Sequence, residues 1–200
     1  MFPKQIKAAI LDFDQTITPL AVDWSKLKKT LSNHLLNKNL QLETSLGIDQ
    51  ALWKIKDRHP LIFQELLKII QEEESKGFAK VVHRSLFQEL SLRKIEIIGI
   101  FSANTSAAIR HILNSPEFQT HLTHLHLFSK ALHIVGKEDV SQPKPHPDGL
   151  LKIIEKTSYP LAEIIYIGDS THDLMAGTDA KVATIQIERM GLKVLNTFFP

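Results

Sequence analysis

The sequence contains no cysteine. This absence excludes disulfide bonds, thiolate metal sites and a cysteine nucleophile, and it is typical of a reducing compartment. Excess charge of one sign is also missing, because 24 Lys and Arg residues face 22 Asp and Glu residues and leave a net charge of +2. Such a small excess disfavours a dedicated nucleic-acid-binding protein that works by counterion release. We therefore expect no nucleic-acid polymer as a partner.

Long apolar runs are absent as well. The longest, such as Ile97–Phe101 and Ile164–Ile167, fall far short of the roughly 20 residues that cross a bilayer. Near the N-terminus, the run Ala8–Leu11 ends at Asp12 and is too short to be a signal-peptide core. We expect a cytoplasmic protein without a membrane partner.

The composition, 43% hydrophobic and 23% charged over 200 residues, is that of an ordinary globular protein. Residues 6–18 and 93–200 alternate short β-branched runs with helical patterns, which predicts an α/β fold with a parallel sheet and helices on both faces. The expected strands are Lys7–Asp12, Ile95–Ser102, Leu122–Phe128, Glu163–Gly168 and Val182–Ile187. The expected helices between them are Asn104–Leu113, Pro147–Lys156 and Asp173–Asp179.

The stretch from about residue 20 to residue 90 has a different pattern. Leucine and isoleucine recur there at spacings of three and four, as at Leu27, Leu31 and Leu35, which indicates helices. One helix is expected to begin at Trp24, and a break is expected at residues 57–60. The pattern predicts a small all-helical insert at 21–89 within an α/β core formed by 1–20 and 90–200.

Paired carboxylates follow the first expected strand. Strand alternation points Asp12 and Asp14 to one side and Phe13 to the other. Two carboxylates held together repel unless a cation joins them or one keeps a proton. The pair therefore indicates a metal ligand, a nucleophile or an acid/base, and the simpler alternative is a polar strand end.

A second acidic pair, Asp169 and Asp173, follows the expected strand at 163–168. Because parallel strands bring their carboxyl ends to one edge, all four aspartates are expected to meet there. An oxygen-only ligand set suits Mg²⁺ better than zinc. The alternative for Asp173 is a favourable interaction with the dipole of the following helix.

Two further segments are weaker signals on their own. Ser102 and Asn104 follow a strand and precede a helix, where they serve either an anion site or a simple N-cap. Lys144 lies between prolines, which would hold it as a positioned charge for phosphate or a carboxylate, although a solvated loop lysine is the plainer interpretation.

Taken in order, these segments read D-x-D-x-T, strand-S-x-N, K-P-x-P and strand-G-D-S-x-x-D. The set resembles the haloacid dehalogenase-like superfamily of Mg²⁺-dependent phosphohydrolases, in particular its phosphoglycolate-phosphatase-like members. The resemblance covers about residues 6–20 and 95–190. It implies a Rossmann-like core, with the helical insert as a cap, and hydrolysis of a small phosphate monoester through an aspartyl-phosphate.

The resemblance also implies roles for individual residues. Asp12 is the expected nucleophile, Asp14 the general acid/base, and Lys144 the cation that neutralises the phosphoryl group. The expected phosphate-binding residues are Thr16, Ser102, Ala103, Asn104 and Lys144. Mg²⁺ is expected on Asp12, Asp169 and the main-chain carbonyl of Asp14, with Asp173 as a ligand or an orienter of its waters.

Some questions stay open at the level of the sequence. Gln15 stands where many relatives have glycine, and we expect it to stiffen the turn after the strand or to crowd the pocket, which would affect the range of substrates and not the activity itself. The expected partner is a small phosphorylated metabolite, and the chain is expected to be a monomer or a homodimer. A phosphomutase on the same core is the alternative enzyme, and a non-catalytic phosphate-binding protein is the alternative outside enzymes.

Overall fold

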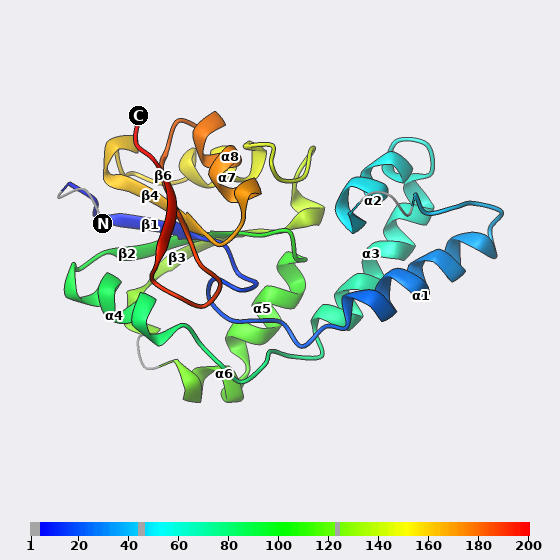
Figure 1. Ribbon diagram of the computed structural model, residues 1–200, viewed down its shortest axis with the longest axis horizontal. Coiled ribbons are helices and arrows are strands. Elements are labelled where there is room, and N and C mark those ends of the chain that lie inside the picture. The colour runs from blue at the N-terminus through cyan, green and yellow to red at the C-terminus, as the bar shows by residue number, and fades with distance from the viewer. Residues whose placement is uncertain (1–4, 44–46, 123–124) are drawn as a thin grey trace.

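A computed structural model describes residues 5–43, 47–122 and 125–200 of the chain. Its centre is a six-stranded sheet in the order β3-β2-β1-β4-β5-β6, and the predicted α/β fold class is confirmed (Figure 1). The first five strands pair in parallel, and β6 pairs antiparallel with β5. The strands are β1 (Ala8–Leu11), β2 (Glu96–Phe101), β3 (Phe128–Val135), β4 (Ile164–Gly168), β5 (Ala183–Ile187) and β6 (Val194–Phe198).

Helices cover both faces of the sheet because strand residues alternate between two apolar clusters. Ala9 and Leu11 of β1 pack with α4 (Arg84–Leu92), α5 (Ser106–Asn114) and α6 (Pro116–His121). Ala8 and Ile10 pack on the opposite side with α7 (Asp148–Ile154) and α8 (Thr171–Asp179). Short 3₁₀ turns lie at Leu125–Leu127, Lys137–Asp139 and Leu161–Glu163.

Three helices form a separate group beside the sheet, at the right of Figure 1: α1 (Trp24–Leu36), α2 (Ile48–Lys56) and α3 (Pro60–Glu74). We call this group the helical unit. Asp23 caps α1 by accepting a hydrogen bond from the Lys26 backbone N–H at 2.9 Å, and Pro60 begins α3. The unit has its own apolar core, which includes Leu31, Leu52 and Leu66.

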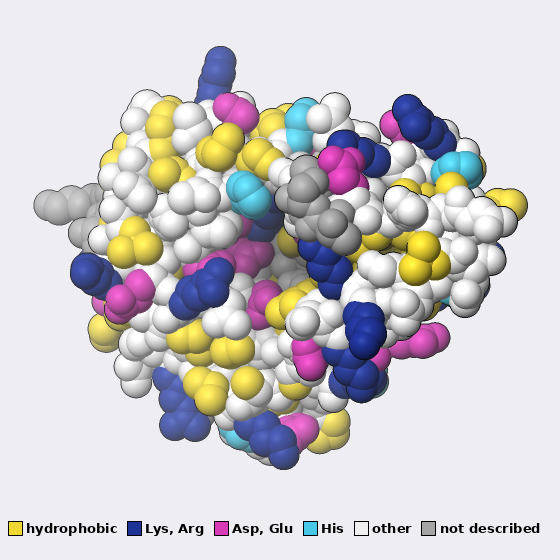
Figure 2. Space-filling model, turned by 45° about the vertical axis from the view of Figure 1, so that its right-hand side comes forward, with side chains coloured by type: hydrophobic (Ala, Val, Ile, Leu, Met, Phe, Trp, Pro, Cys, Tyr) yellow, Lys and Arg dark blue, Asp and Glu magenta, His cyan; other side chains and the backbone are white. Residues whose placement is uncertain are grey.

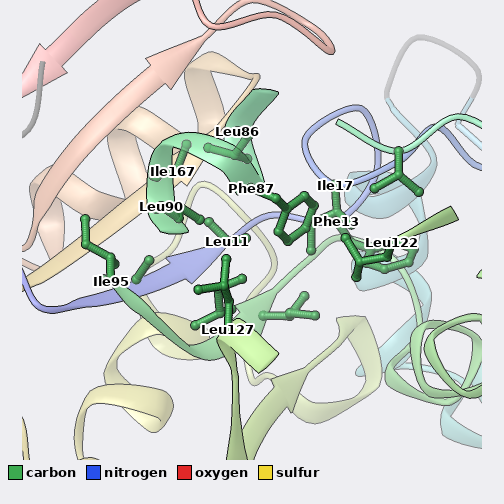
Figure 3. Packing of buried hydrophobic residues seen from close by; sticks show 14 of the residues in the cluster. Leu11, Phe13, Ile17, Leu86, Phe87, Leu90, Ile95, Leu122, Leu127 and Ile167 are labelled. Carbon is green, nitrogen blue, oxygen red and sulfur yellow. The ribbon is translucent and has the colours of Figure 1, made fainter. Parts of the chain in front are cut away.

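Helix α4 packs against the sheet and is not part of the helical unit. Its buried residues Leu86, Phe87 and Leu90 lie in the same cluster as Leu11 and Phe13 (Figure 3). The insert predicted at 21–89 thus includes a helix whose packing partners are in the core, and the division into two domains stays a prediction. None of the helices in the described part of the chain has the length and apolar character needed to cross a membrane.

The strand predicted at Leu122–Phe128 is wrong for Leu122 and for residues 125–127, and among the described residues of that segment only Phe128 lies in a strand. Residues 123–124 lie outside the described residues, 125–127 form a 3₁₀ turn, and the strand begins only at Phe128. Leu122 and Leu127 are buried in the core cluster, so their spacing reflects the packing of turns and not a pleat. The pairing with β2 is made by Phe128 and by residues 133–135.

Candidate active site

The carboxyl ends of β1, β2 and β4 open into a cavity of about 430 Å³ between the sheet and the helical unit. Figure 2 shows this hollow with acidic and basic side chains around it. Predicted site residues that line it are Asp12, Asp14, Ser102, Ala103, Asn104, Lys144, Asp169 and Asp173. The helical unit adds Trp24, Ile48, Asp49 and Gln50 to the lining. The four sequence motifs therefore meet in one place.

Lys144 joins two buried carboxylates at the bottom of the site. Its Nζ lies 2.7 Å from Asp12 Oδ1 and 2.6 Å from Asp173 Oδ1, and it also stands over the Phe101 ring. Burial would lower the pKa of Lys144, but the two carboxylates outweigh burial and raise it, so the ammonium stays charged. Lys144 is thus a buried charge held between two carboxylates and not a solvated loop lysine.

The pKa values of Asp12 and Asp173 are shifted in opposite directions, although both carboxylates contact Lys144. Burial raises the pKa of Asp12 to about 7, with Lys144 lowering it and the Asp173 charge raising it. Burial also opposes ionisation of Asp173, yet Lys144 and hydrogen bonds from Ser170 and Tyr166 bring its pKa below the ordinary value. Asp173 is therefore the firmly ionised carboxylate, and Asp12 is the one whose charge is costly.

The Asp173 carboxylate is held by donors on both oxygens. Oδ1 accepts from Lys144 and from the Tyr166 hydroxyl at 2.5 Å, and Oδ2 accepts from the Ser170 backbone N–H at 3.0 Å and its hydroxyl at 2.6 Å. Ser170 and Asp173 also form the capping box of α8. The capping alternative from the sequence is thus true of Asp173, and its contact with Lys144 adds a second role.

Asp12, Asp169 and Asp173 form a cluster suited to a cation. One carboxylate oxygen from each lies within 4.8 Å of the others. Burial raises the pKa of Asp169, and Arg189 offsets part of that effect through Nε, 3.1 Å from Asp169 Oδ2. Because all three side chains offer hard oxygen donors, the cluster provides a setting that fits a divalent ion such as Mg²⁺.

Asp14 lies beside this cluster on the turn after β1. Its Oδ1 accepts a hydrogen bond from the Leu20 backbone N–H at 2.8 Å, and burial raises its pKa. Gln15 follows with a φ of 64°, in the left-handed region that glycine adopts without cost. The turn geometry therefore explains why glycine suits this position, and the Gln15 side chain lines the cavity.

Ser102 and Asn104 form a connected loop at the end of β2. The Ser102 hydroxyl donates to Asn104 Oδ1 at 2.9 Å, and Asn104 Nδ2 donates to Glu74 Oε1 at 3.1 Å. The first N–H groups of α5 are taken by acids, since the Ser106 backbone N–H donates to Glu138 at 2.8 Å. The loop residues, and not the first turn of α5, thus face the cavity.

Thr16 is the predicted phosphate-binding residue that the structure does not bring to the cavity. It is fully buried, and within the described chain its hydroxyl has no hydrogen-bond partner. Its carbonyl lies 3.2 Å from His83 Nδ1, beneath the turn that carries Asp14. Thr16 is therefore a buried residue of the turn and not part of the cavity lining.

The sequence model of the haloacid dehalogenase-like hydrolases matches residues 9–187, which include all four motifs. The chain belongs to this family. The resemblance expected from the motifs is thereby confirmed.

Individual relatives agree with this family assignment. A haloacid dehalogenase-like hydrolase domain-containing protein of Arabidopsis thaliana is 27% identical over 192 residues, which are 94% of this chain and 73% of that protein. The phosphoglycolate phosphatase of Escherichia coli K12 is 36% identical over 47 residues, or 24% of this chain. That match spans only 19% of the phosphatase's own length.

Solved structures show the same fold. A haloacid dehalogenase-like hydrolase from Bacteroides fragilis superposes with a TM-score of 0.60 at 21% identity, covering 95% of this chain and 90% of that one. CbbY from Rhodobacter sphaeroides, in complex with phosphate, has a TM-score of 0.58 at 15% identity, covering 92% and 86%. At these identities the likeness concerns the fold alone.

In this haloacid dehalogenase-like hydrolase, several residues of the site carry no motif in the sequence. Tyr166 lies in β4 and donates to Asp173, while Arg189 comes from the loop between β5 and β6. Lys137 lines the cavity, and Glu74 lies behind the Ser102 loop. Of the charged residues among these, only Glu74 has a sequence pattern that indicates burial. It lies on the apolar stripe of its helix, after Leu67 and Ile70.

Proposed function

We propose that this hydrolase is a Mg²⁺-dependent phosphatase that cleaves a small phosphate monoester through an aspartyl-phosphate on Asp12. The observation that carries the proposal is the convergence of Asp12, Lys144, Asp169 and Ser102 on one cavity at the carboxyl edge of the sheet. The match to a phosphoglycolate phosphatase, although short, supports the choice of a phosphate ester. A cavity of about 430 Å³ suits a metabolite and not a polymer.

Asp12 is the proposed nucleophile. One of its carboxylate oxygens bonds to phosphorus while the bond from phosphorus to the leaving oxygen breaks. Lys144, 2.7 Å from Asp12 Oδ1, lowers the pKa of that carboxyl and opposes the effect of its burial. The same ammonium would offset negative charge on the oxygens of a phosphoryl group bound to Asp12.

Asp14 is the proposed general acid and then base. Burial raises its pKa, so it holds a proton over a wider pH range than an exposed aspartate and can give it to the leaving oxygen. Once deprotonated, it takes a proton from the water that attacks the phosphorus of the aspartyl-phosphate. Inorganic phosphate leaves, and Asp12 is free again.

The metal site would consist of Asp12, Asp169 and the main-chain carbonyl of Asp14. Bound Mg²⁺ would supply positive charge to the phosphoryl oxygens in the transition state. Each Asp173 oxygen already accepts two hydrogen bonds, so we propose that Asp173 holds Lys144 and orients metal-bound water instead of ligating directly. Ser102 and its loop would bind the phosphoryl group.

The test is an assay with a small aryl phosphate, with Mg²⁺ and after thorough chelation. We expect Mg²⁺-dependent turnover, no turnover by Asp12→Asn, and ordinary turnover by Asp179→Asn, which changes an exposed aspartate at the end of α8. Full activity after chelation, or labelled phosphate on a residue other than Asp12, would contradict the proposal. Isomerisation of a sugar phosphate that depends on a bisphosphate would identify a mutase, and phosphate binding without turnover would identify a binding protein.

A further inference from the structure

Glu74 is a buried acid from the helical unit that reaches the phosphate-binding loop of the core. It is the last residue of α3 and has no exposed surface. Its Oε2 accepts hydrogen bonds from the backbone N–H and the hydroxyl of Thr105, both at 2.7 Å, and its Oε1 accepts from Asn104 Nδ2 at 3.1 Å. A fully buried glutamate is rare unless its partners hold it as a charge.

Lys137 provides a second link between the same elements. Its Nζ lies 3.4 Å from Glu74 Oε1 and 3.1 Å from Asp49 Oδ1 in α2, and only 3% of its side chain is exposed. Its backbone N–H also donates to the Asn104 carbonyl at 2.9 Å. The core lysine thus lies between two acids of the helical unit and directly against the loop.

The hydrogen bond from Asn104 to Glu74 also determines which Asn104 atom faces Ser102. Because Asn104 Nδ2 donates to Glu74, the amide must turn its oxygen toward Ser102, whose hydroxyl donates to it at 2.9 Å. An Asn104 amide without Glu74 would be free to flip, and the Ser102 hydroxyl would lose its fixed acceptor. One carboxylate therefore sets the geometry of two residues in the cavity.

We propose that Glu74 is a positioning residue through which the helical unit, once seated on the core, orders the Ser102–Thr105 loop for binding a phosphoryl group. This inference rests on the proposed function, since it assigns that loop to phosphate. It also gives the helical unit a part in assembling the site, beyond covering it.

The experiment compares Glu74→Gln with Glu72→Gln, an exposed acid on the same helix. For each variant and the wild type, the affinity for inorganic phosphate is measured by calorimetry, and kcat and KM are measured for an aryl phosphate with Mg²⁺. We expect Glu74→Gln to weaken phosphate binding and to raise KM by about tenfold or more, the loss expected for one hydrogen bond to a charged group. Glu72→Gln should match the wild type, and thermal melts confirm folding.

A double-mutant cycle separates positioning from a general structural role. If Glu74 acts through the Ser102 hydroxyl, Glu74→Gln should have a much smaller effect on phosphate affinity in a Ser102→Ala background. Full additivity of the two changes would overturn the inference. If Glu74→Gln does not fold, Asp49→Asn tests the same coupling through Lys137, and unchanged phosphate affinity in that variant would overturn it.

Failure of this inference is distinguishable from failure of the proposed function. A wild-type protein that hydrolyses the ester, with Glu74→Gln indistinguishable from Glu72→Gln, refutes the inference alone. A wild-type protein that binds phosphate without hydrolysis refutes the phosphatase proposal and leaves the binding comparison valid. A wild-type protein that does neither refutes both.

Discussion

Replacing the proposed nucleophile by asparagine is expected to abolish activity and also to make the metal-free fold more stable at pH 8. Asp12 is only 6% exposed, and burial raises its pKa from 3.8 to about 7, with Lys144 lowering the pKa and Asp173 raising it. Asparagine has nearly the same shape and no charge to desolvate. It still offers an oxygen to the Lys144 ammonium.

The magnitude and the sign follow from the two pKa values. A carboxyl whose pKa is raised by folding favours the folded state below its unfolded pKa and loses that contribution as the pH rises through the folded value. Between pKa 3.8 and about 7 the shift is roughly three units, at about 1.36 kcal/mol per unit. The raised pKa of Asp12 therefore costs the folded state about 4 kcal/mol at pH 8, where the buried group is charged, and about 2 kcal/mol at pH 5, where it holds a proton that the unfolded chain releases.

The assay is urea unfolding of the wild type and Asp12→Asn in the presence of a chelator, at pH 5 and at pH 8. The other titrating groups are present in both proteins, so the stability advantage of the variant should grow by about 2–3 kcal/mol between the two pH values. Added Mg²⁺ should then stabilise the wild type more than the variant, because binding to the folded state alone adds stability. A variant that is less stable at pH 8, or an advantage independent of pH, would refute the reasoning.

Further predictions concern the residues around Asp12. Asp14→Asn should still accept phosphate from an activated aryl ester but release it slowly, so labelled phosphate should accumulate on the protein; rapid release would contradict the acid/base role. Gly168→Ala would place a Cβ 2.3 Å from Asp173 Cγ, and we expect a loss of about 1–3 kcal/mol in unfolding free energy with weaker Mg²⁺ binding by calorimetry. Gln15→Gly should raise stability by up to about 1 kcal/mol in thermal melts, because relief of the left-handed φ exceeds the added chain entropy. Ca²⁺ should inhibit turnover, since its looser coordination disturbs the geometry of attack.

The sheet and the four motifs were predictable because both follow periodic or local rules. Buried parallel strands appear as short β-branched runs, and parallel strands necessarily gather the residues at their carboxyl ends. The sequence alone therefore predicted that Asp12, Ser102 and Asp169 lie near one another at the carboxyl edge of the sheet. The family resemblance added their expected roles.

Elements with weak periodicity were missed or misplaced. Helix α6 has six residues, and β6 has five residues that are mostly exposed, so neither has a pattern that stands out. The alternation of apolar and polar residues at Leu122–Phe128 does not reflect a strand. Its apolar residues Leu122 and Leu127 lie outside strands and are buried in the core. Short segments of this kind take their structure from tertiary contacts, which a single sequence does not display.

Buried charges were the hardest part of the site to predict. Glu74 lies in the acidic run 72–74 and Lys137 follows a strand, and both positions are typical of solvated residues. The two charged groups lie 3.4 Å apart across the boundary between α3 and the core, so each places an opposite charge beside the other. Only the apolar stripe that ends at Glu74 marked that position as unusual.

These buried charges bear on what the helical unit does for the candidate site. If the insert only selected substrates, its contacts with the core would be apolar or would avoid the catalytic loops. Instead, Trp53 Nε1 donates to the Ser141 carbonyl and Lys56 Nζ to the Val140 carbonyl, both at 2.9 Å, while Glu74 holds the loop after β2. Hydrogen bonds depend on distance and angle more steeply than apolar contacts do. A small displacement of the helical unit would therefore disturb the loop before it exposed much apolar surface, so under the proposed role of Glu74 the seating of the unit and the order of the Ser102–Thr105 loop would change together.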